Sequence, residues 1–444
     1  MYLFITTPKQ KMTIDGSWLS SFKEEAPEAF TKNIPFHPQA VFSDGQIRLM
    51  QSPPNSPQTW DDYIFKRFIS YYTNLLKHSK TLIVAFDNYQ YVPTAKAMTQ
   101  TSRRKHIPTI PFSETSPLPC MVPEGESWTQ HIANRTFKVK VIELITMRLP
   151  KLLLSKFPDA TIIIDYDQPI LYTKDSFQDL DMPPLGEADV KFTRWAEMYP
   201  KLLVDSIDGD SVPISLIHLE RKLQQQSTTP PHVVILRYKI NLEKKRKSPD
   251  APKPHKEFEY LNVPLLYLTL KQAVSQATGK LLFHQHIGHE MRMITTLIIL
   301  TGTDFSRHLP QVSGKTVWDM LVSLWVPLII SYDPLSSQIT PEKALSKLIP
   351  TIYQTKFSKQ LPRKPENYDD LYHLLSHSKL APRTKSSLAS EPQILCTVLN
   401  ANWILQYWSG ESPPDPISPQ FGYQKYKGKV YYQDQTPVYQ ADKA

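Results

Sequence analysis

The 444-residue sequence is poor in the residues that mark several large protein classes. It has two cysteines, Cys120 and Cys396, which are too few for a disulfide framework or a cysteine zinc site and fit a reducing compartment. Only 12 glycines stand against 40 prolines, so we expect long, stiff, irregular connections. No apolar run reaches the length of a membrane span; the best, Leu321 to Ile330, is short and contains Pro327. These absences exclude a disulfide-rich secreted domain and a membrane-spanning protein.

The sequence also lacks a complete nucleotide-binding loop, and its first residues do not have the pattern of a signal peptide. Ser313-Gly314-Lys315-Thr316 at a predicted helix start presents backbone N–H groups that bind an anion. The first glycine of the G-x-x-x-x-G-K-T pattern is missing, however, which disfavours an ATPase. The N-terminus shows no basic segment followed by a long apolar stretch, so no signal peptide is expected.

Positive charge is in excess. The chain has 51 Lys and Arg against 42 Asp and Glu, a formal net charge of +9. At 41% hydrophobic and 21% charged residues it is globular, with a core large enough for one large domain or two. This balance favours a polyanionic partner such as nucleic acid, although excess lysine can also reflect solubility alone.

Two acidic pairs stand out against this basic background. Gly186-Glu187-Ala188-Asp189 precedes Asp208-Gly209-Asp210 by about twenty residues, and the second pair follows the predicted strand Leu202 to Val204. Carboxylates at strand ends and helix starts converge when the strands are parallel neighbours. Such a group of carboxylates repels itself unless a cation neutralises it, and hard oxygen ligands suit Mg²⁺ or Mn²⁺. The sequence therefore predicts a metal-dependent site for phosphate chemistry.

A further carboxylate, Asp87, ends the predicted buried strand Thr81 to Phe86. The basic residues that follow it are Lys96, Arg103, Arg104 and Lys105. An acidic strand end followed by basic side chains suits a site that holds a metal and clamps a phosphate. A solvated basic loop is an equally good interpretation of these residues taken alone.

Other acidic, histidine-rich and basic segments can be explained without a role in catalysis. Asp15 alone suits a helix N-cap, and Asp165 with Asp167 suits a turn after the strand Ala160 to Ile164. His284, His286 and His289 lack an evident fourth metal ligand apart from Glu290, so a metal role for them is disfavoured. The basic run Lys244 to Lys247 is consistent with a nuclear-import signal, a nucleic-acid patch or a solvated linker.

The pattern of apolar residues predicts the remaining elements. Residues 33 to 58 are rich in Pro and Ser and are predicted to form a loop, whereas Val212 to Leu219 and Val233 to Leu242 are predicted strands. The predicted helical segments are Trp60 to Lys77, Trp128 to Leu154, Met291 to Leu300, Pro341 to Leu348, Asp369 to Leu380 and Ile394 to Trp408.

In order and spacing, these motifs resemble the flap endonuclease/XPG superfamily of structure-specific nucleases. Gly186-Glu187-Ala188-Asp189 is similar to the family's Gly-Glu-Ala-(Glu/Asp), and Asp208-Gly209-Asp210 to its Asp-x-Asp. Leu300-Thr301-Gly302-Thr303-Asp304-Phe305 resembles Leu-x-Gly-x-Asp-Tyr, which precedes a helix–turn–helix DNA clamp. Ile14-Asp15-Gly16-Ser17 resembles the early Val-Asp-x-Ser, and Phe86-Asp87-Asn88 the Phe-Asp-Gly strand end. The resemblance covers roughly residues 10 to 330.

The resemblance implies an α/β fold with a PIN-like, mostly parallel central sheet flanked by helices, a helix–turn–helix DNA clamp and a C-terminal helical extension. It implies hydrolysis of phosphodiesters with two Mg²⁺ or Mn²⁺ ions. One ion would be held by Asp87, Glu187, Asp189 and Asp208, and the second by Asp210 and Asp304, with Asp15 at the inner edge. Lys96 and Arg103 would grip the phosphate, beside Arg104 and Lys105, and the helix near Lys315, with Ser313, Gly314 and Thr316, would hold duplex backbone.

The partner implied is nucleic acid, with DNA favoured over RNA, no membrane and no clean sliding-clamp motif in the tail. The expected location is intracellular, nuclear or at a viral replication site. Two alternatives remain: an RNA endonuclease of the same fold, and an inactive nucleic-acid-binding scaffold. We expect a nuclease core over 1–240, a basic linker over 241–258, the rest of the core with the clamp over 259–332, a helical extension over 333–409, and a Pro- and Tyr-rich tail over 410–444.

Overall fold

The computed structural model describes residues 18–54, 59–88, 128–206, 208–227, 230–240, 256–278, 288–303, 309–380, 388–410, 418–426 and 429–432. The strands of the main sheet are β1 (Phe30–Thr31), β2 (Ala40–Asp44), β3 (Thr81–Ala85), β4 (Thr161–Asp165), β5 (Ile170–Tyr172), β6 (Phe177–Asp179), β7 (Lys201–Asp205), β8 (His232–Ile240) and β9 (Lys256–Asn262). The helices up to residue 278 are α1 (Trp18–Glu25), η2 (Pro27–Ala29), α2 (Gly45–Met50), α3 (Trp60–Ile64), η3 (Phe65–Ile69), α4 (Ser70–Leu75), α6 (Trp128–Ala133), α7 (Arg135–Lys156), α8 (Ala188–Met198), α9 (Ser211–Gln224) and α10 (Val263–Thr278).

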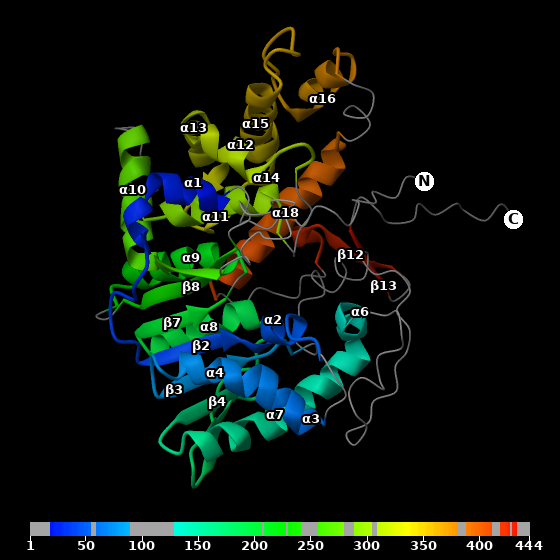
Figure 1. Cartoon of the computed structure of the whole chain (residues 1–444). Helices are drawn as coiled ribbons and strands as arrows, with labels where there is room; N and C mark the ends of the chain where they lie inside the picture. Colours follow the sequence, from blue (N-terminus) through cyan, green and yellow to red (C-terminus); the bar gives the residue numbers. More distant parts are fainter. Residues whose placement is uncertain are drawn as a thin grey trace, which may run out of the picture.

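The later elements are mostly helical. They are α11 (Glu290–Thr301), α12 (Gly314–Asp319), α13 (Leu321–Ser331), β10 (Tyr332–Asp333), β11 (Gln338–Ile339), α14 (Pro341–Lys343), η8 (Ala344–Leu348), α15 (Ile349–Lys356), α16 (Tyr368–Ser376), α18 (Glu391–Trp408), η9 (Pro419–Phe421), β12 (Tyr423–Tyr426) and β13 (Lys429–Tyr432). In Figure 1 the helices α12 to α16 lie beyond the β8 end of the sheet.

The central sheet has nine strands in the order β1-β9-β8-β7-β2-β3-β4-β5-β6. The five inner strands, from β8 through β7, β2 and β3 to β4, run parallel to one another, and the outer strands on both sides are antiparallel. The expected α/β fold with a mostly parallel central sheet flanked by helices is therefore confirmed.

Each face of this sheet supports its own hydrophobic core, because successive side chains of a strand point to opposite faces. Val41, Leu82 and Leu203 face the helices from α3 to α7. Phe42 and Ile83 face α1 and the helices from α8 onwards. Burying each large apolar side chain stabilises the fold by about 1.5–3 kcal/mol, so both helical layers are firmly attached to the sheet (Figure 1).

The chain changes direction across the sheet between β2 and β7. From β2 it builds outward through β3 to β4, and it then returns to the other side of β2 to place β7 and β8. In open parallel sheets the crevice at such a topological switch point, outside the carboxyl ends of the strands, is where ligands bind. The strand order thus singles out the edge of the sheet at which Asp44 ends β2 and Asp205 ends β7.

The prediction of a loop over residues 33 to 58 is wrong. Ala40–Asp44 forms β2, the central strand, and Gly45–Met50 forms α2 directly after it. Gly45 is required at this junction, because a Cβ there would lie 2.6 Å from the ring of Phe86. The Pro and Ser residues that surround this five-residue strand conceal it in the sequence.

The prediction of a strand over Val212 to Leu219 is also wrong, since these residues lie in helix α9. All ten residues from Ser211 to Glu220 are buried. The predicted segment Val212 to Leu219 contains no Asp, Glu, Lys or Arg, and a short apolar run of this kind is not distinguished from a buried strand by periodicity alone. The strand predicted next is present as β8 over His232–Ile240, and it pairs with β7 and β9.

The segment after Gly410, expected to be an extended tail, contains structure. Tyr423–Tyr426 and Lys429–Tyr432 pair as an antiparallel hairpin, β12–β13. Phe421 and Tyr423 are buried in the core, and the amide of Asn400 on α18 donates a hydrogen bond to the backbone oxygen of Phe421. Among the helices in the described ranges, none combines the length and the apolar character that crossing a bilayer requires.

Candidate metal centre

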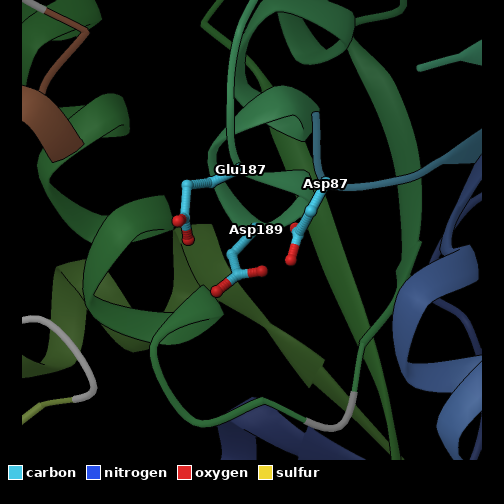
Figure 2. Close-up of side chains that lie close together, drawn as sticks. All are labelled: Asp87, Glu187 and Asp189. Carbon is cyan, nitrogen blue, oxygen red and sulfur yellow. The ribbon is translucent and has the colours of Figure 1, made fainter. Parts of the chain in front are cut away.

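Three buried carboxylates meet outside the carboxyl end of β3. Asp87 comes two residues after β3, Glu187 immediately precedes α8, and Asp189 lies in its first turn. One oxygen from each lies within 4.8 Å of the other two. Figure 2 shows the three side chains directed into one space. The sequence-based prediction that these acids converge is therefore confirmed for this trio.

Backbone contacts hold the trio together. The Oδ1 atom of Asp87 accepts a hydrogen bond from the backbone N–H of Ala188 at 3.0 Å, in the first turn of α8. The backbone N–H of Asn88 donates to the carbonyl oxygen of Gly186 at 2.7 Å. The start of a helix favours negative charge, which helps this junction to hold carboxylates. These two hydrogen bonds join the end of β3 to the start of α8.

Asp44 is a fourth carboxylate of this centre, and the sequence-based assignment missed it. Its Oδ1 atom caps α2 by accepting from the N–H groups of Gln46 at 2.8 Å and Ile47 at 3.0 Å. Burial, with the nearby charges of Asp189 and Asp87, raises the pKa of Asp44 well above its ordinary value, and Asp208 adds to the effect. The signal that could have found it is the short apolar run Ala40 to Phe42, which leads to Asp44 and Gly45 just as a strand leads to a helix cap.

Strand geometry explains why Asp44 belongs to the centre and Asp205 does not. Asp44 lies two residues after Phe42, whose side chain belongs to the core under α8, so its carboxylate points to that face. Asp205 lies opposite Ser43 in the neighbouring strand and points to the other face. There it accepts hydrogen bonds from the hydroxyls of Ser43 at 2.8 Å and Tyr71 at 2.7 Å. These hydrogen bonds give Asp205 a structural role on the face of the sheet away from the trio.

The second predicted acidic pair forms the turn between β7 and α9. The Oδ1 atom of Asp208 accepts a hydrogen bond from the N–H of Asp210 at 3.1 Å. The backbone carbonyl oxygen of Asp208 accepts another from the Ser211 hydroxyl at 2.7 Å. Asp208 is half-buried and close enough to Asp44 to influence its pKa, so it lies at the same edge of the sheet. Asp210 is buried at the N-cap of α9, outside the trio.

Asp165 is placed at the same edge but is neutralised by cations. Lys191 contacts it at 3.2 Å and Arg194 at 2.5 Å, and the indole N–H of Trp195 donates to it at 2.6 Å. Burial acts to raise the pKa of Asp165, and the charges of Lys191 and Arg194 outweigh burial and lower it overall. The preferred interpretation of this residue, a turn after a strand instead of a metal ligand, agrees with these contacts.

The metal-free protein should lose stability with rising pH because of Asp44. A carboxyl whose pKa is higher in the folded than in the unfolded state takes up a proton on folding. The stabilisation that this carboxyl contributes is therefore fully present below its unfolded pKa of about 4. It is lost as the pH rises from that value through the higher pKa of the folded state. In chelator at pH 8 we expect Asp44→Asn to raise Tm by about 2–4 °C, the change that about 1 kcal/mol produces in a large domain.

The measurement is a pair of thermal melts, at pH 5 and pH 8, with EDTA. Asparagine retains the helix cap, so the variant tests charge alone. Asp159→Asn, in an exposed turn, is the control and should leave Tm unchanged at both pH values. Equal Tm values for wild type and Asp44→Asn at pH 8 would show that burial and the neighbouring carboxylates do not destabilise the charged form of Asp44.

Several predicted site residues cannot be compared with this centre. Asp15, Lys96, Arg103, Arg104, Lys105 and Asp304 lie outside the described residues, as do His284 and His286. Ser313 is the N-cap of α12, and its hydroxyl accepts a hydrogen bond from the N–H of Thr316 at 3.2 Å. Gly314 is the first residue of α12, a helix of six residues that also contains Lys315. The N-terminus of α12 is thus capped by its own chain.

The donor set suits a hard divalent cation. The trio offers carboxylate oxygens only, and oxygen ligands are those that Mg²⁺, Mn²⁺ and Ca²⁺ prefer. Opposite ligands of a magnesium ion are about 4.2 Å apart, from Mg–O distances of about 2.1 Å. The oxygens of the trio, all within 4.8 Å of one another, are therefore close enough to share one divalent ion.

Comparisons with known proteins give no family assignment. No protein-family model and no curated protein matches the chain. Among solved structures the chain is similar to the catalytic core of Rad2 in complex with a DNA substrate, at 11% identity over 90% of this chain and 99% of that chain, with a TM-score of 0.36. A TM-score this low supports no conclusion about function, for which the carboxylates of this chain are the better guide.

Proposed function

We propose that this chain is a divalent-metal-dependent nuclease of the flap endonuclease type that hydrolyses phosphodiester bonds of DNA. One observation carries the proposal: four carboxylates at the switch point are almost fully buried, with exposed fractions of 5% for Asp44, 6% for Asp87, 0% for Glu187 and 8% for Asp189. Removing a carboxylate from water costs several kcal/mol unless an opposite charge lies beside it. Lys191 is a buried cation whose charge acts on both Asp165 and Asp87, and Asp165 is its ion-pair partner at 3.2 Å. A bound dication would offset the mutual repulsion of these carboxylates.

The chemistry follows from these charges. Divalent ions, when bound, activate a water molecule and neutralise the charge that develops on the phosphate. The chain's part is to hold them with Asp44, Asp87, Glu187 and Asp189. Half-buried Asp208 lies nearer to solvent, where it is suited to the second ion that the two-ion mechanism requires. Asp210 and Asp304 would assist it, and Asp15 would act at the inner edge.

The basic segment after β3 supplies the substrate's counter-charge in this proposal. Lys96 and Arg103 would grip the scissile phosphate, and Arg104 and Lys105 would bind the adjoining backbone. The net charge of +9 supports a polyanionic substrate despite the acidic centre. Four buried carboxylates argue against a scaffold that has lost its catalytic acids.

The test is cleavage of matched DNA and RNA flap and single-strand substrates in Mg²⁺, Mn²⁺ or EDTA. We expect cleavage in Mg²⁺, none in EDTA, and recovery when Mg²⁺ is added in excess. Faster cleavage of the RNA substrates would identify an RNA endonuclease with the same centre. If Mg²⁺ and Mn²⁺ neither support cleavage nor raise Tm, the proposal is wrong.

A further inference from the structure

A basic pocket lies at the end of the sheet opposite to the acidic centre. It has a volume of about 280 Å³, and its basic side chains are Lys32, His37, Lys77 and His78. His37 precedes β2 and His78 precedes β3, so the pocket is at the amino ends of these parallel strands. A five-residue strand is about 16 Å long, which separates the pocket clearly from the carboxylates at the other end.

The charge of the pocket has one sign. No carboxylate is among the described residues that line it. Lys77 donates a hydrogen bond at 2.9 Å to the side-chain oxygen of Asn74, a neutral partner, so its charge is not cancelled by that contact. Burial, together with the charge of Lys77, lowers the pKa of half-buried His78. An anion in the pocket would relieve this repulsion, since it favours the protonated imidazole.

The pocket also has an aromatic wall. Phe36 and Tyr260 line it and are both half-buried. Aromatic rings beside cationic side chains bind a nucleotide by stacking on the base and pairing with the phosphate. The volume is near the lower limit for ligand pockets, about 300 Å³, which suits a small ligand.

The loops that form the pocket are held by the fold. The hydroxyl of Ser79 donates to the carbonyl oxygen of Gln39 at 2.8 Å and joins the segments that carry His78 and His37. Tyr260 on β9 lies opposite Thr31 on β1, which fixes it beside Lys32. The basic and aromatic side chains therefore come together from β1, β9 and the segments before β2 and β3, which are far apart in the sequence.

We propose that the basic pocket binds a nucleoside phosphate, with Lys32, Lys77 and the two histidines at the phosphate and Phe36 and Tyr260 at the base. The ligand is a free mononucleotide or the phosphorylated end of a nucleic-acid strand, which present the same chemistry. The pocket shares no residue with the acidic centre, so this proposal can be tested separately from the proposed nuclease activity.

The experiment is calorimetric titration in EDTA, where the acidic centre holds no metal and repels phosphate. The probes are AMP, adenosine, inorganic phosphate and a 5′-phosphorylated single-stranded oligonucleotide. We expect AMP to bind at least about tenfold more tightly than adenosine or phosphate, because it uses both parts of the pocket. If the oligonucleotide binds more tightly than AMP and its binding weakens in the pocket variants, the ligand is a strand end; the reverse order identifies a free nucleotide.

Two variants and one control decide the assignment. Lys77→Ala and Tyr260→Leu should each weaken AMP binding about tenfold, by loss of a charge-assisted contact and of a stacking surface. Lys80→Ala removes an exposed lysine three positions from Lys77 and should change binding less than about twofold. Thermal melts confirm that each variant is folded. The proposal is overturned if AMP shows no saturable binding, or if binding is unchanged in both folded pocket variants.

Discussion

Glu187→Gln is expected to slow phosphodiester cleavage by about 10³-fold, the scale at which loss of one electrostatic group in a catalytic centre acts. Glu187 is fully buried and belongs to the trio with Asp87 and Asp189, so the amide removes one of the negative charges that hold the ion. The substitution keeps the volume of the side chain, and removing mutual repulsion should preserve or raise the Tm without metal. Single-turnover cleavage of a flap substrate in Mg²⁺ measures the rate, and circular dichroism the fold.

The matched control lies on the same helix. Glu197 on α8 has a half-exposed side chain and forms an ion pair with Lys222 at 2.7 Å, far along α8 from the trio. Glu197→Gln should therefore cleave at the wild-type rate. If Glu187→Gln cleaves as fast as Glu197→Gln at saturating Mg²⁺, the trio does not take part in catalysis and the nuclease proposal loses its main support.

Asp165→Asn is expected to lower the free energy of unfolding by about 3–5 kcal/mol, the cost of breaking a buried ion pair on one side. The carboxylate accepts hydrogen bonds from Lys191, Arg194 and Trp195 with its two oxygens. The side-chain amide of asparagine has only one oxygen acceptor and no charge. Lys191 is fully buried and would keep only its contacts with the carbonyl oxygens of Phe86, Asp165 and Tyr166. Urea denaturation followed by circular dichroism measures the loss.

Asp167→Asn is the control for this change. Asp167 is exposed, two residues after Asp165, and accepts one hydrogen bond from the Asn88 side chain at 3.0 Å. It should alter the free energy of unfolding by less than about 0.5 kcal/mol. Asp165→Asn and Asp44→Asn are predicted to act in opposite directions, although both aspartates end parallel strands on the same face. Equal, small effects for Asp165→Asn and Asp167→Asn would contradict a structural ion pair.

The prediction from sequence is confirmed where a carboxylate follows an apolar run that no Pro or Ser interrupts. Thr81 to Phe86 marks β3 and points to Asp87, and the motif around Glu187 and Asp189 marks the start of α8. Because parallel strands share one carboxyl edge, convergence of these acids could be predicted without knowing the strand order. The order itself could not, since nothing local in β2 or β7 states that they are neighbours.

Sequence reasoning failed where burial hides the usual signals. Asp44 was missed because Pro- and Ser-rich flanks made a five-residue strand look like part of a loop. The prediction of a strand within α9 is wrong because Val212 to Leu219 is a short buried run without Asp, Glu, Lys or Arg, which fits either a strand or a helix. The different roles of Asp44, Asp165 and Asp205 depend on which face of the sheet each enters and on which cations lie there. Those facts exist only in three dimensions.

The position of β2 has a consequence for folding during synthesis on the ribosome. This strand is the first of the parallel set to be synthesised, yet it lies in the middle, and its partner β7 follows more than 150 residues later. Until β7 emerges, one side of β2 offers an unpaired row of backbone donors and acceptors flanked by apolar side chains, the condition under which strands join the wrong chain. Nascent chains released before residue 200 should therefore aggregate or remain bound to chaperones, and genetic fusions or truncations that interrupt this interval should express poorly.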